Sequence, residues 1–283
     1  MKRYLILLCF FLMSNIFFAK TFEDILGKPI NGFSSVNSLN SIWDCYIIIL
    51  DNQKIELIDY DNQRADTDNW NKIYNYEIII GETYYYLHIY ADNYDETYLM
   101  LLSEYLIILY TKDSMQPYFI GGYNLERGDE VGEILNFNST TYLSELNNQY
   151  LPKNLSNQKL NSPWCEGAEG YGIGEKITFS VEEAKGLAIF NGYVSYVKDY
   201  LYNQNSRIKL LKIELVNLNY SFEQEIMDTP NPQFIDFQKE LKEKNQINYT
   251  GKVVITILDV YKGSKYQDTC INSIVTMNPI SLK

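Results

Sequence analysis

Residues 161 to 175 read NSPWCEGAEGYGIGE, and residues 259 to 270 read DVYKGSKYQDTC. Each stretch gathers glycine, aromatic and acidic residues around a single cysteine. Each also adjoins segments rich in the β-branched and aromatic residues that strands favour. These shared features predict that the two stretches form the two ends of one compact domain. Its first and last strands would lie side by side and bring Cys165 close to Cys270.

The segments around these two stretches predict a β-sandwich. The clearest strands are residues 175–180, 187–191, 207–217, 252–260 and 271–277. Side chains alternate between the two faces of a strand, so Val253, Ile255 and Ile257 share one face of theirs. An apolar row of this kind predicts that at least one side of the strand is buried, as in a sandwich. In residues 207–215 the alternation is imperfect, and a β-bulge near Leu211 would restore it.

The amino-terminal half also consists of strand-like segments, separated by very short connections. They are residues 42–50, 55–60, 73–80, 83–90, 97–102 and 105–110. Gly81-Glu82 and Ser103-Glu104 have the composition of tight turns. The segments do not alternate with helical ones, as they would in a parallel sheet. The pattern therefore predicts an antiparallel meander or a small barrel.

The strand pattern weakens beyond Gly121-Gly122, where residues 141–150 suggest a short helix. Residues 151–160 have the polar composition of a linker. The chain is therefore expected to be all-β and to divide into four parts. These are a signal peptide at residues 1–19, an antiparallel β domain of unknown role at 20–150, the linker at 151–160 and a β-sandwich domain at 161–283.

The first residues have the features of an export signal. Lys2 and Arg3 form a charged start, residues 5–18 form an apolar run, and Ala19 supplies a small residue for cleavage. The apolar run is too short to span a bilayer comfortably. The protein is thus expected to be exported to the periplasm, the cell surface or the extracellular space, with no membrane span after signal removal. An uncleaved anchor is the alternative, because Phe17 stands where a second small residue is expected.

Export also changes the expected state of the cysteines. Cys45, Cys165 and Cys270 remain after signal removal, and an oxidising compartment favours a disulfide. We predict that Cys165 pairs with Cys270 and that Cys45 is a buried, unpaired thiol. Closing a loop of about 100 residues in this way stabilises a protein by roughly 4.7 kcal/mol in the chain-entropy model. The alternative is three free thiols in the core.

The composition excludes several classes of function. A formal net charge of -12 argues against nucleic acid as a partner, because phosphate binding needs clustered lysine and arginine. The only histidine is His88, which excludes a Ser-His-Asp triad or a histidine-based zinc cage within the carboxy-terminal half. No phosphate loop, His-Glu-x-x-His or Gly-x-Ser-x-Gly motif occurs. We therefore expect no cofactor, no metal ion and no enzymatic activity.

Acidic residues offer two alternatives to that expectation. Glu166 and Glu175 flank the glycine-rich stretch, and they would suit a general acid and base if they lay about 5 to 9 Å apart, as in glycosidases. We favour structural roles in which they cap loop amides or pair with Arg207 or Lys265. Residues 59–68 resemble a calcium loop only superficially, because they lack its central glycine and terminal glutamate.

Five motifs, in order along the chain, support a family resemblance. They are Ser162-Pro-Trp-Cys-Glu-Gly, Gly170-x-Gly-x-Gly-Glu, Asn191-Gly-Tyr, Asn205-x-Arg-x-Lys and Asp259-x-Tyr-x-Gly-x-Lys-Tyr-x-Asp-Thr-Cys-Ile. With them, residues 161–277 resemble the bacterial NADase-type glycan-binding domain, which is a discoidin-like, galactose-binding-like jelly roll. The resemblance implies a jelly-roll β-sandwich that binds carbohydrate. The sequence departs from the family pattern at Asn272-Ser273, where the family tends to place Ser-Glu.

Loop residues of the carboxy-terminal half suit a sugar site. A neutral sugar needs an aromatic face for its C–H side and fixed polar groups for its hydroxyls. The residues expected to supply these are Asn191, Tyr193, Asn205, Arg207, Tyr261 and Lys265. Arg207 offers a planar guanidinium group, and the two tyrosines offer ring faces. The alternative is a structural network of hydrogen bonds and ion pairs that holds strand ends together, formed by Asn205, Arg207 and Lys209 with the stretch from Asp259 to Asp268.

These inferences combine into one functional hypothesis. The protein is expected to be an exported, non-catalytic carbohydrate-binding protein that binds a glycan through its jelly roll. A structural or protein-interaction protein of the periplasm or cell surface is the alternative. A large exposed apolar patch on residues 83–110 would favour that alternative, because such a patch marks a protein interface.

Overall fold

The computed structural model describes residues 29–35, 42–50, 52–59, 72–103, 107–112, 116–122, 131–132, 134–156 and 158–277. The expected signal peptide, nearly all of the calcium-like segment and the side chain of Cys45 lie outside the described part of the chain. Within that part, no helix has the length and apolar character needed to cross a membrane.

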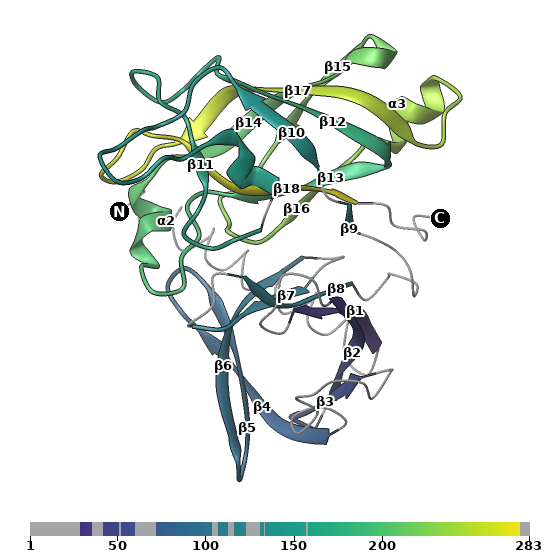
Figure 1. Cartoon of the computed structure of the whole chain (residues 1–283), viewed down its shortest axis with the longest axis vertical. Coiled ribbons are helices and arrows are strands. Elements are labelled where there is room, and N and C mark those ends of the chain that lie inside the picture. Colours follow the sequence, from purple (N-terminus) through teal and green to yellow (C-terminus); the bar gives the residue numbers. More distant parts are fainter. Residues whose placement is uncertain are drawn as a thin grey trace, which may run out of the picture.

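The described part of the amino-terminal half forms a closed antiparallel barrel (Figure 1). Its strands are β1 (Pro29–Ser35), β2 (Ile42–Leu50), β3 (Lys54–Asp59), β4 (Lys72–Ile80), β5 (Tyr85–Ala91), β6 (Tyr94–Leu102), β7 (Ile107–Tyr110) and β8 (Pro117–Gly122). Each strand pairs with the next along the chain, and pairing of β1 with β8 closes the barrel. The prediction of an antiparallel meander or small barrel is confirmed.

Alternation along the strands separates the inside of the barrel from its outside. In β5, Leu87 and Ile89 belong to the buried interior cluster, whereas His88 between them lies on the outer face beside exposed carboxylates. Toward the end of β6 the outer face is buried as well, because Leu99 and Leu101 pack against the second half of the molecule. The barrel thus has one wall that is apolar on both faces.

The carboxy-terminal half is a β-sandwich of two antiparallel sheets. One sheet has the order β10 (Leu135–Ser139), β12 (Lys176–Ala184), β17 (Tyr249–Tyr261), β14 (Arg207–Leu215), β15 (Tyr220–Glu225). The other has the order β11 (Trp164–Cys165), β18 (Cys270–Met277), β13 (Gly186–Asn191), β16 (Gln233–Asp236), and β9 (Val131–Gly132) pairs with β18. The connections contain η2 (Pro152–Ser156), α2 (Tyr200–Gln204), η3 (Val216–Leu218) and α3 (Gln238–Glu243). The expected all-β fold with a sandwich in the second half is confirmed.

The two sheets enclose one apolar core. Val253, Ile255 and Ile257 of β17 are all fully buried in it, as the predicted alternation requires. The pairing of β14 with β17 shifts register between Ile208 and Leu211. The β-bulge expected near Leu211 is therefore confirmed.

The segment before and within the expected linker differs from the sequence prediction. The strand β10 pairs with β12 of the sandwich. Residues 141–150 form no helix, and Ser144 instead bridges to Gln149, so the helix prediction is wrong. In the stretch expected to be a linker, Leu155 is fully buried in the sandwich core. The sandwich therefore takes residues on the amino side of position 161 into its sheet and its core.

One wall of the barrel packs directly on the sandwich (Figure 1). The buried cluster at this contact contains Tyr84, Leu99, Leu101, Ile108 and Tyr110 from the barrel and Leu160, Ala188, Phe190, Val194, Tyr202 and Val275 from the sandwich. Polar groups are matched across it, since Ser195 N donates to Tyr84 Oη at 3.2 Å and Tyr110 Oη donates to Gln158 O at 2.8 Å. Separating the halves would expose these large apolar side chains, so each half stabilises the other.

His88, on the outer face of the barrel, lies between two carboxylates. Its Nδ1 is 2.9 Å from Glu77 Oε1, and its Nε2 is 2.8 Å from Asp95 Oδ1. The imidazole also stacks on Tyr90, with ring centroids 5.0 Å apart. The hydrogen bonds with Glu77 and then Asp95 raise the pKa of His88 above its usual value.

We expect His88→Gln to destabilise the protein more at about pH 5 than at about pH 8.5. A raised folded-state pKa means that the folded protein binds the proton more tightly than the unfolded chain does. This stabilisation is fully present below the unfolded pKa of about 6.5 and is lost as the pH rises through the folded value. Because both carboxylates are largely exposed, the effect should stay below about 1 kcal/mol. Thermal midpoints of both proteins at the two pH values measure it, and an equal difference at both would contradict it.

Candidate functional site

Connecting segments meet at one end of the sandwich, where backbone hydrogen bonds hold them together. The connections that precede β14 and β18 are joined, because Ser206 N donates to Asp268 O at 3.0 Å. Residues 141–150 are attached to β11, since Leu143 N donates to Cys165 O at 2.8 Å. Segments that are far apart in the sequence therefore form one surface.

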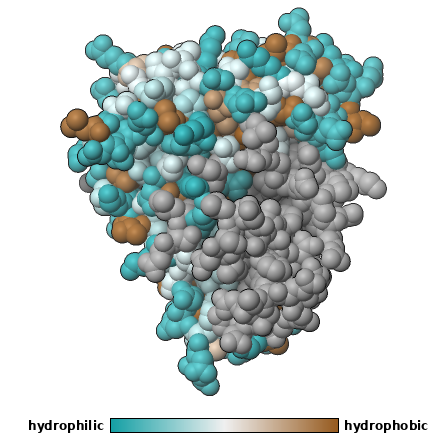
Figure 2. Space-filling model, in the orientation of Figure 1, coloured by the Kyte–Doolittle hydropathy of each residue, from teal (hydrophilic) through white to brown (hydrophobic). Residues whose placement is uncertain are grey.

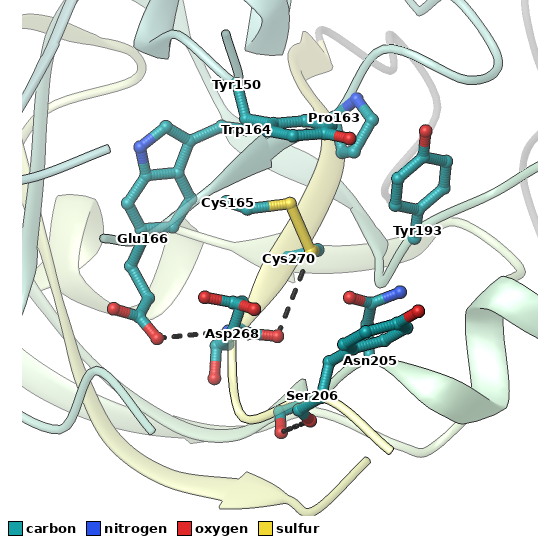
Figure 3. The surroundings of a disulfide bond; sticks show 12 residues. Tyr150, Pro163, Trp164, Cys165, Glu166, Tyr193, Asn205, Ser206, Asp268 and Cys270 are labelled. Atoms are coloured by element: carbon teal, nitrogen blue, oxygen red, sulfur yellow. Dashed lines mark hydrogen bonds between the residues drawn. A yellow bond between two sulfur atoms is a disulfide. The ribbon is translucent and has the colours of Figure 1, made fainter. Parts of the chain in front are cut away.

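A disulfide lies beneath this surface (Figure 3). Cys165 and Cys270 are register partners in β11 and β18, their Cα atoms are 4.2 Å apart, and their sulfur atoms are bonded. The predicted pairing is confirmed. The bond fixes the start of β18, and with it Asp268, which lies two residues before Cys270.

Glu166 is fully buried next to the disulfide. Its carboxylate accepts hydrogen bonds from Thr269 N at 3.2 Å and from Ala168 N at 2.7 Å. Burial raises the pKa of Glu166 above its usual value. Gly172 has a φ of +67°, and a Cβ there would lie 2.5 Å from Glu166 Cγ, so the glycine makes room for the buried carboxylate.

The carboxylate of Glu175 is also held by hydrogen bonds within the protein. Its Oε2 accepts hydrogen bonds at 2.5 Å from the hydroxyls of Thr140 and Thr141. Glu166 therefore caps loop amides as expected, whereas the described contacts of Glu175 are with hydroxyls rather than with amides, Arg207 or Lys265. The structure therefore offers no support for their use as a glycosidase pair.

Two of the residues expected to bind glycan are buried amides with structural partners. Asn191 is fully buried, and its Nδ2 donates to Ile208 O at 2.8 Å while its Oδ1 accepts from Ile208 N at 3.0 Å. Asn205 Nδ2 donates to Leu201 O at 2.8 Å. Asn191 thus ties β13 to β14, and Asn205 ends the helix α2. Both amides thus have structural hydrogen-bond partners, and for Asn205 this agrees with the structural network given as the alternative.

Arg207 is buried as well, with an exposed fraction of 6%. Its Nε and Nη2 donate to the two carboxylate oxygens of Asp228, at 3.0 and 2.5 Å, and its Nη1 donates to Asn205 O at 3.0 Å. The guanidinium carbon lies 5.2 Å from the ring centroid of Tyr202. Burial alone would lower the pKa of Arg207, but the hydrogen bonds and the negative charge of Asp228 outweigh it and raise the pKa. The side chain is a structural ion pair with little surface left for a ligand.

The other three expected residues keep exposed surface. Tyr193 and Tyr261 are half-buried, and Lys265 is exposed with its Nζ 4.8 Å from the ring centroid of Tyr266. Tyr261 is the register partner of Arg207, Lys265 N donates to Gln204 O at 3.2 Å, and Gly192 N, next to Tyr193, donates to Cys270 O at 3.0 Å. The structure thus brings the expected residues to one end of the sandwich. Only Tyr193, Tyr261 and Lys265 among them present side-chain surface to a ligand.

The most distinctive group at this end consists of Glu145, Tyr150, Tyr193 and Asp268, which we call the aromatic–acidic cluster. The rings of Tyr150 and Tyr193 meet edge to face, with centroids 6.1 Å apart. Tyr150 Oη donates to Glu145 Oε2 at 3.4 Å. Burial raises the pKa of Asp268, and the negative charge of Glu145 raises it further. Figure 3 shows Tyr150, Tyr193 and Asp268 around the disulfide.

Sequence reasoning identified only Tyr193 of this cluster as a ligand residue. Glu145 and Tyr150 were missed because they belong to the segment 141–150, which was expected to be a helix outside the sandwich domain. Asp268 lies in the Asp259–Cys270 motif, and its spacing of two residues from a half-cystine was the one signal that could have placed it here.

Comparison with known proteins agrees with this architecture. The family model of the NAD glycohydrolase translocation F5/8 type C domain matches residues 129–277, more than half of the chain. The match begins before β9 and β10 and ends with the last residue of β18, so it covers the whole sandwich and its disulfide. No curated protein matches the sequence. With its discoidin-like sandwich, this chain belongs to the family of the NAD glycohydrolase translocation F5/8 type C domain.

Proposed function

We propose that this protein is an exported, non-catalytic protein that binds a glycan through the aromatic–acidic cluster of its sandwich. The observation that carries the proposal is the placement of the Tyr150–Tyr193 ring pair beside Glu145 and Asp268, on a surface anchored by the disulfide. Aromatic rings bind the C–H face of a sugar, and carboxylates accept hydrogen bonds from its hydroxyls.

Several observations support parts of this proposal. The disulfide Cys165–Cys270 is typical of an oxidising compartment, which agrees with export. Glu166 and Glu175 are engaged by loop amides and hydroxyls, which agrees with binding without catalysis. The carboxylates of the cluster, Glu145 and Asp268, form no ion pair with a basic residue among the described contacts. Their negative charge would repel an anionic sugar, so a neutral sugar suits the cluster better.

The alternative, a protein-interaction role, would have been favoured by a large exposed apolar patch on the strands of residues 83–110. The structure instead buries Leu99, Leu101 and Ile108 of those strands against the sandwich of the same chain. That face is therefore already covered. A protein partner would have to use another surface, and the exposed Leu146 at the tip of the segment 141–150 is one place where it could begin.

Glycan binding by the full chain tests the proposal. We expect saturable binding to a class of neutral glycans on an array, and we expect Asp268→Asn and Tyr193→Ala each to weaken it by about tenfold, or about 1.4 kcal/mol. The matched control is Tyr90→Ala, which removes an exposed tyrosine from the outer face of the barrel. The full chain is needed because the barrel and the sandwich share a buried contact. Absence of binding to every sugar class, or an equal loss of glycan affinity in the Tyr90→Ala control, would contradict the proposal.

A further inference from the structure

The buried carboxylate of Glu166 holds the chain segment that carries Asp268. Glu166 Oε1 accepts from Thr269 N at 3.2 Å, and Glu166 N donates to Thr269 O at 3.1 Å. The second carboxylate oxygen accepts from Ala168 N at 2.7 Å. Glu166 thus engages both polar backbone groups of Thr269, the residue that follows Asp268. Figure 3 shows Glu166 and Asp268 beside the disulfide.

The peptide group between Asp268 and Thr269 is held at both of its polar atoms. Its oxygen, Asp268 O, accepts from Ser206 N at 3.0 Å, and its nitrogen, Thr269 N, donates to Glu166. Thr269 is fully buried, whereas the side chain of Asp268 is only half-buried. The direction in which the Asp268 side chain points therefore depends on the hydrogen bond from this peptide to Glu166.

The surroundings of Glu166 favour its protonated form. Burial raises the pKa of Glu166, and the negative charges of Asp268 and Glu175 raise it further, while the two amide hydrogen bonds act in the opposite direction without outweighing burial. These two carboxylates are the charged groups that face Glu166 in the described part of the chain, and no basic residue pairs with it among the described ion pairs. Gly172, which makes room for the Glu166 side chain, has no titratable group.

Protonation of Glu166 removes one of its hydrogen bonds. An ionised carboxylate accepts at both oxygens, whereas a protonated carboxyl group turns one oxygen into an O–H donor. Both oxygens of Glu166 face amide N–H groups, those of Thr269 and Ala168. An O–H at either position meets another donor, so one of the two amide groups loses its acceptor.

We propose that Glu166 is a positioning residue for the aromatic–acidic cluster, which as a carboxylate orients Asp268 toward the glycan and as a carboxylic acid releases it. This role depends on the proposed glycan site, to which it adds release in acid. Protonation of Glu166 favours the folded state. A raised folded-state pKa means that the stability contribution of this group is fully present below the unfolded pKa of about 4.3 and is lost as the pH rises through the folded value. Release of the glycan therefore requires no unfolding.

An NMR titration of the full chain without glycan tests the link between Glu166 and Thr269. The amide protons of Thr269 and Ala168 should shift together, with an apparent pKa above the ordinary glutamate value of about 4.3. In Glu166→Gln this shared step should disappear, because the amide side chain does not titrate. The wild-type titration needs no variant, so it is decisive even if Glu166→Gln does not fold. Absence of the step from wild type, or its persistence in folded Glu166→Gln, would overturn the proposal.

An array of neutral glycans, read at about pH 7.5 and at about pH 4.5, tests the effect on binding. At the higher pH, Glu166→Gln should bind about fivefold more weakly than wild type, because its side chain accepts only one of the two amide hydrogen bonds. Acidification should weaken binding by wild type by about fivefold or more. It should still weaken Asp268→Asn, in which Glu166 titrates and position 268 does not, and it should change the affinity of Glu166→Gln less than that of wild type.

The matched control is Glu240→Gln. Glu240 is a carboxylate that is 5% exposed and lies in α3, which Figure 1 shows at the opposite side of the sandwich from β11. This variant should bind as wild type does at both pH values, and circular dichroism checks that every protein is folded. Equal wild-type affinity at the two pH values, or a Glu166→Gln variant with the affinity and pH dependence of wild type, would refute the role of Glu166 and leave glycan binding standing. Absence of wild-type binding at both pH values would contradict the proposed function instead, and the amide titration then decides whether Glu166 controls the Asp268 segment.

Discussion

Replacing both Cys165 and Cys270 by alanine is expected to lower the free energy of unfolding by about 3 to 5 kcal/mol. The disulfide closes a loop of 105 residues that contains most of the sandwich, and a loop of about this length corresponds to about 4.7 kcal/mol in the chain-entropy model. The native contacts of β11 do not compensate, because this strand has only two residues. Urea unfolding, followed by tyrosine and tryptophan fluorescence, measures the change.

Reduction provides the matched control for this prediction. Wild type treated with a strong reductant should lose about as much stability as the double variant, and the variant itself should not respond to the reductant. The loss should extend to glycan binding, since the bond fixes the start of β18 beside Asp268. A double variant within about 1 kcal/mol of wild type would show that the loop is held by its other contacts.

The all-β character and the strand positions could be predicted from the sequence because they depend on local signals. Short turns such as Gly81-Glu82 leave adjacent strands no option except antiparallel pairing, and the alternation of Val253, Ile255 and Ile257 shows directly which face of β17 is buried. The five ordered motifs also sufficed to indicate the family that the comparison shows. These properties require no knowledge of contacts between distant residues.

Features that depend on distant contacts could not be predicted in this way. Closure of the barrel rests on pairing of residues 31–34 with residues 119–122, which carry no local sign of each other. The segment 141–150 lacks a helix because it is fixed from outside, by Leu143 N donating to Cys165 O and by Trp164 Nε1 donating to Thr141 O at 3.2 Å. Tertiary hydrogen bonds therefore override a weak local helix preference.

The candidate site shows the same limit. Its residue types and its place at one end of the sandwich were recognisable, but the sequence could not show that Arg207 is paired with Asp228, which lies in a connection with no assigned role. A planar donor on a loop suits a sugar and suits a buried carboxylate equally well. Burial separates the two uses, and burial is a property of the whole fold.

Loss of the buried ion pair of Arg207 should have a second large effect on stability. Replacing Arg207 by Met is expected to lower the free energy of unfolding by about 3 kcal/mol. The variant leaves Asp228 with the Tyr202 hydroxyl as its one remaining partner among the described contacts, and it removes the hydrogen bond to Asn205 O. Breaking one side of a buried ion pair costs about 3 to 5 kcal/mol. The low end applies here because the Asp228 side chain is 31% exposed and partly hydrated.

Urea unfolding at neutral pH measures this loss of stability. Two further variants test its cause. Arg207→Lys keeps the charge but cannot donate to both oxygens of Asp228 at once, so it should recover only part of the stability. Lys209→Met is the matched control, because it removes a cation two residues along the same strand whose ion pair with Asp259 is about half exposed on both sides. That control should be close to wild type. A control as unstable as Arg207→Met would contradict the assignment of the effect to burial.

Glycan affinity separates a structural role for Arg207 from a direct one. If the guanidinium acts only through Asp228 and Asn205, the folded fraction of Arg207→Met, assayed well below its thermal midpoint, should bind glycan as tightly as wild type does. Asp268→Asn should show the reverse pattern, with weaker binding and a thermal midpoint close to that of wild type. The half-buried side chain of Asp268 keeps some surface at this end of the sandwich, and it is the carbonyl that makes the structural contact with Ser206. Loss of glycan affinity in a fully folded Arg207→Met variant would show that Arg207 contacts the ligand directly.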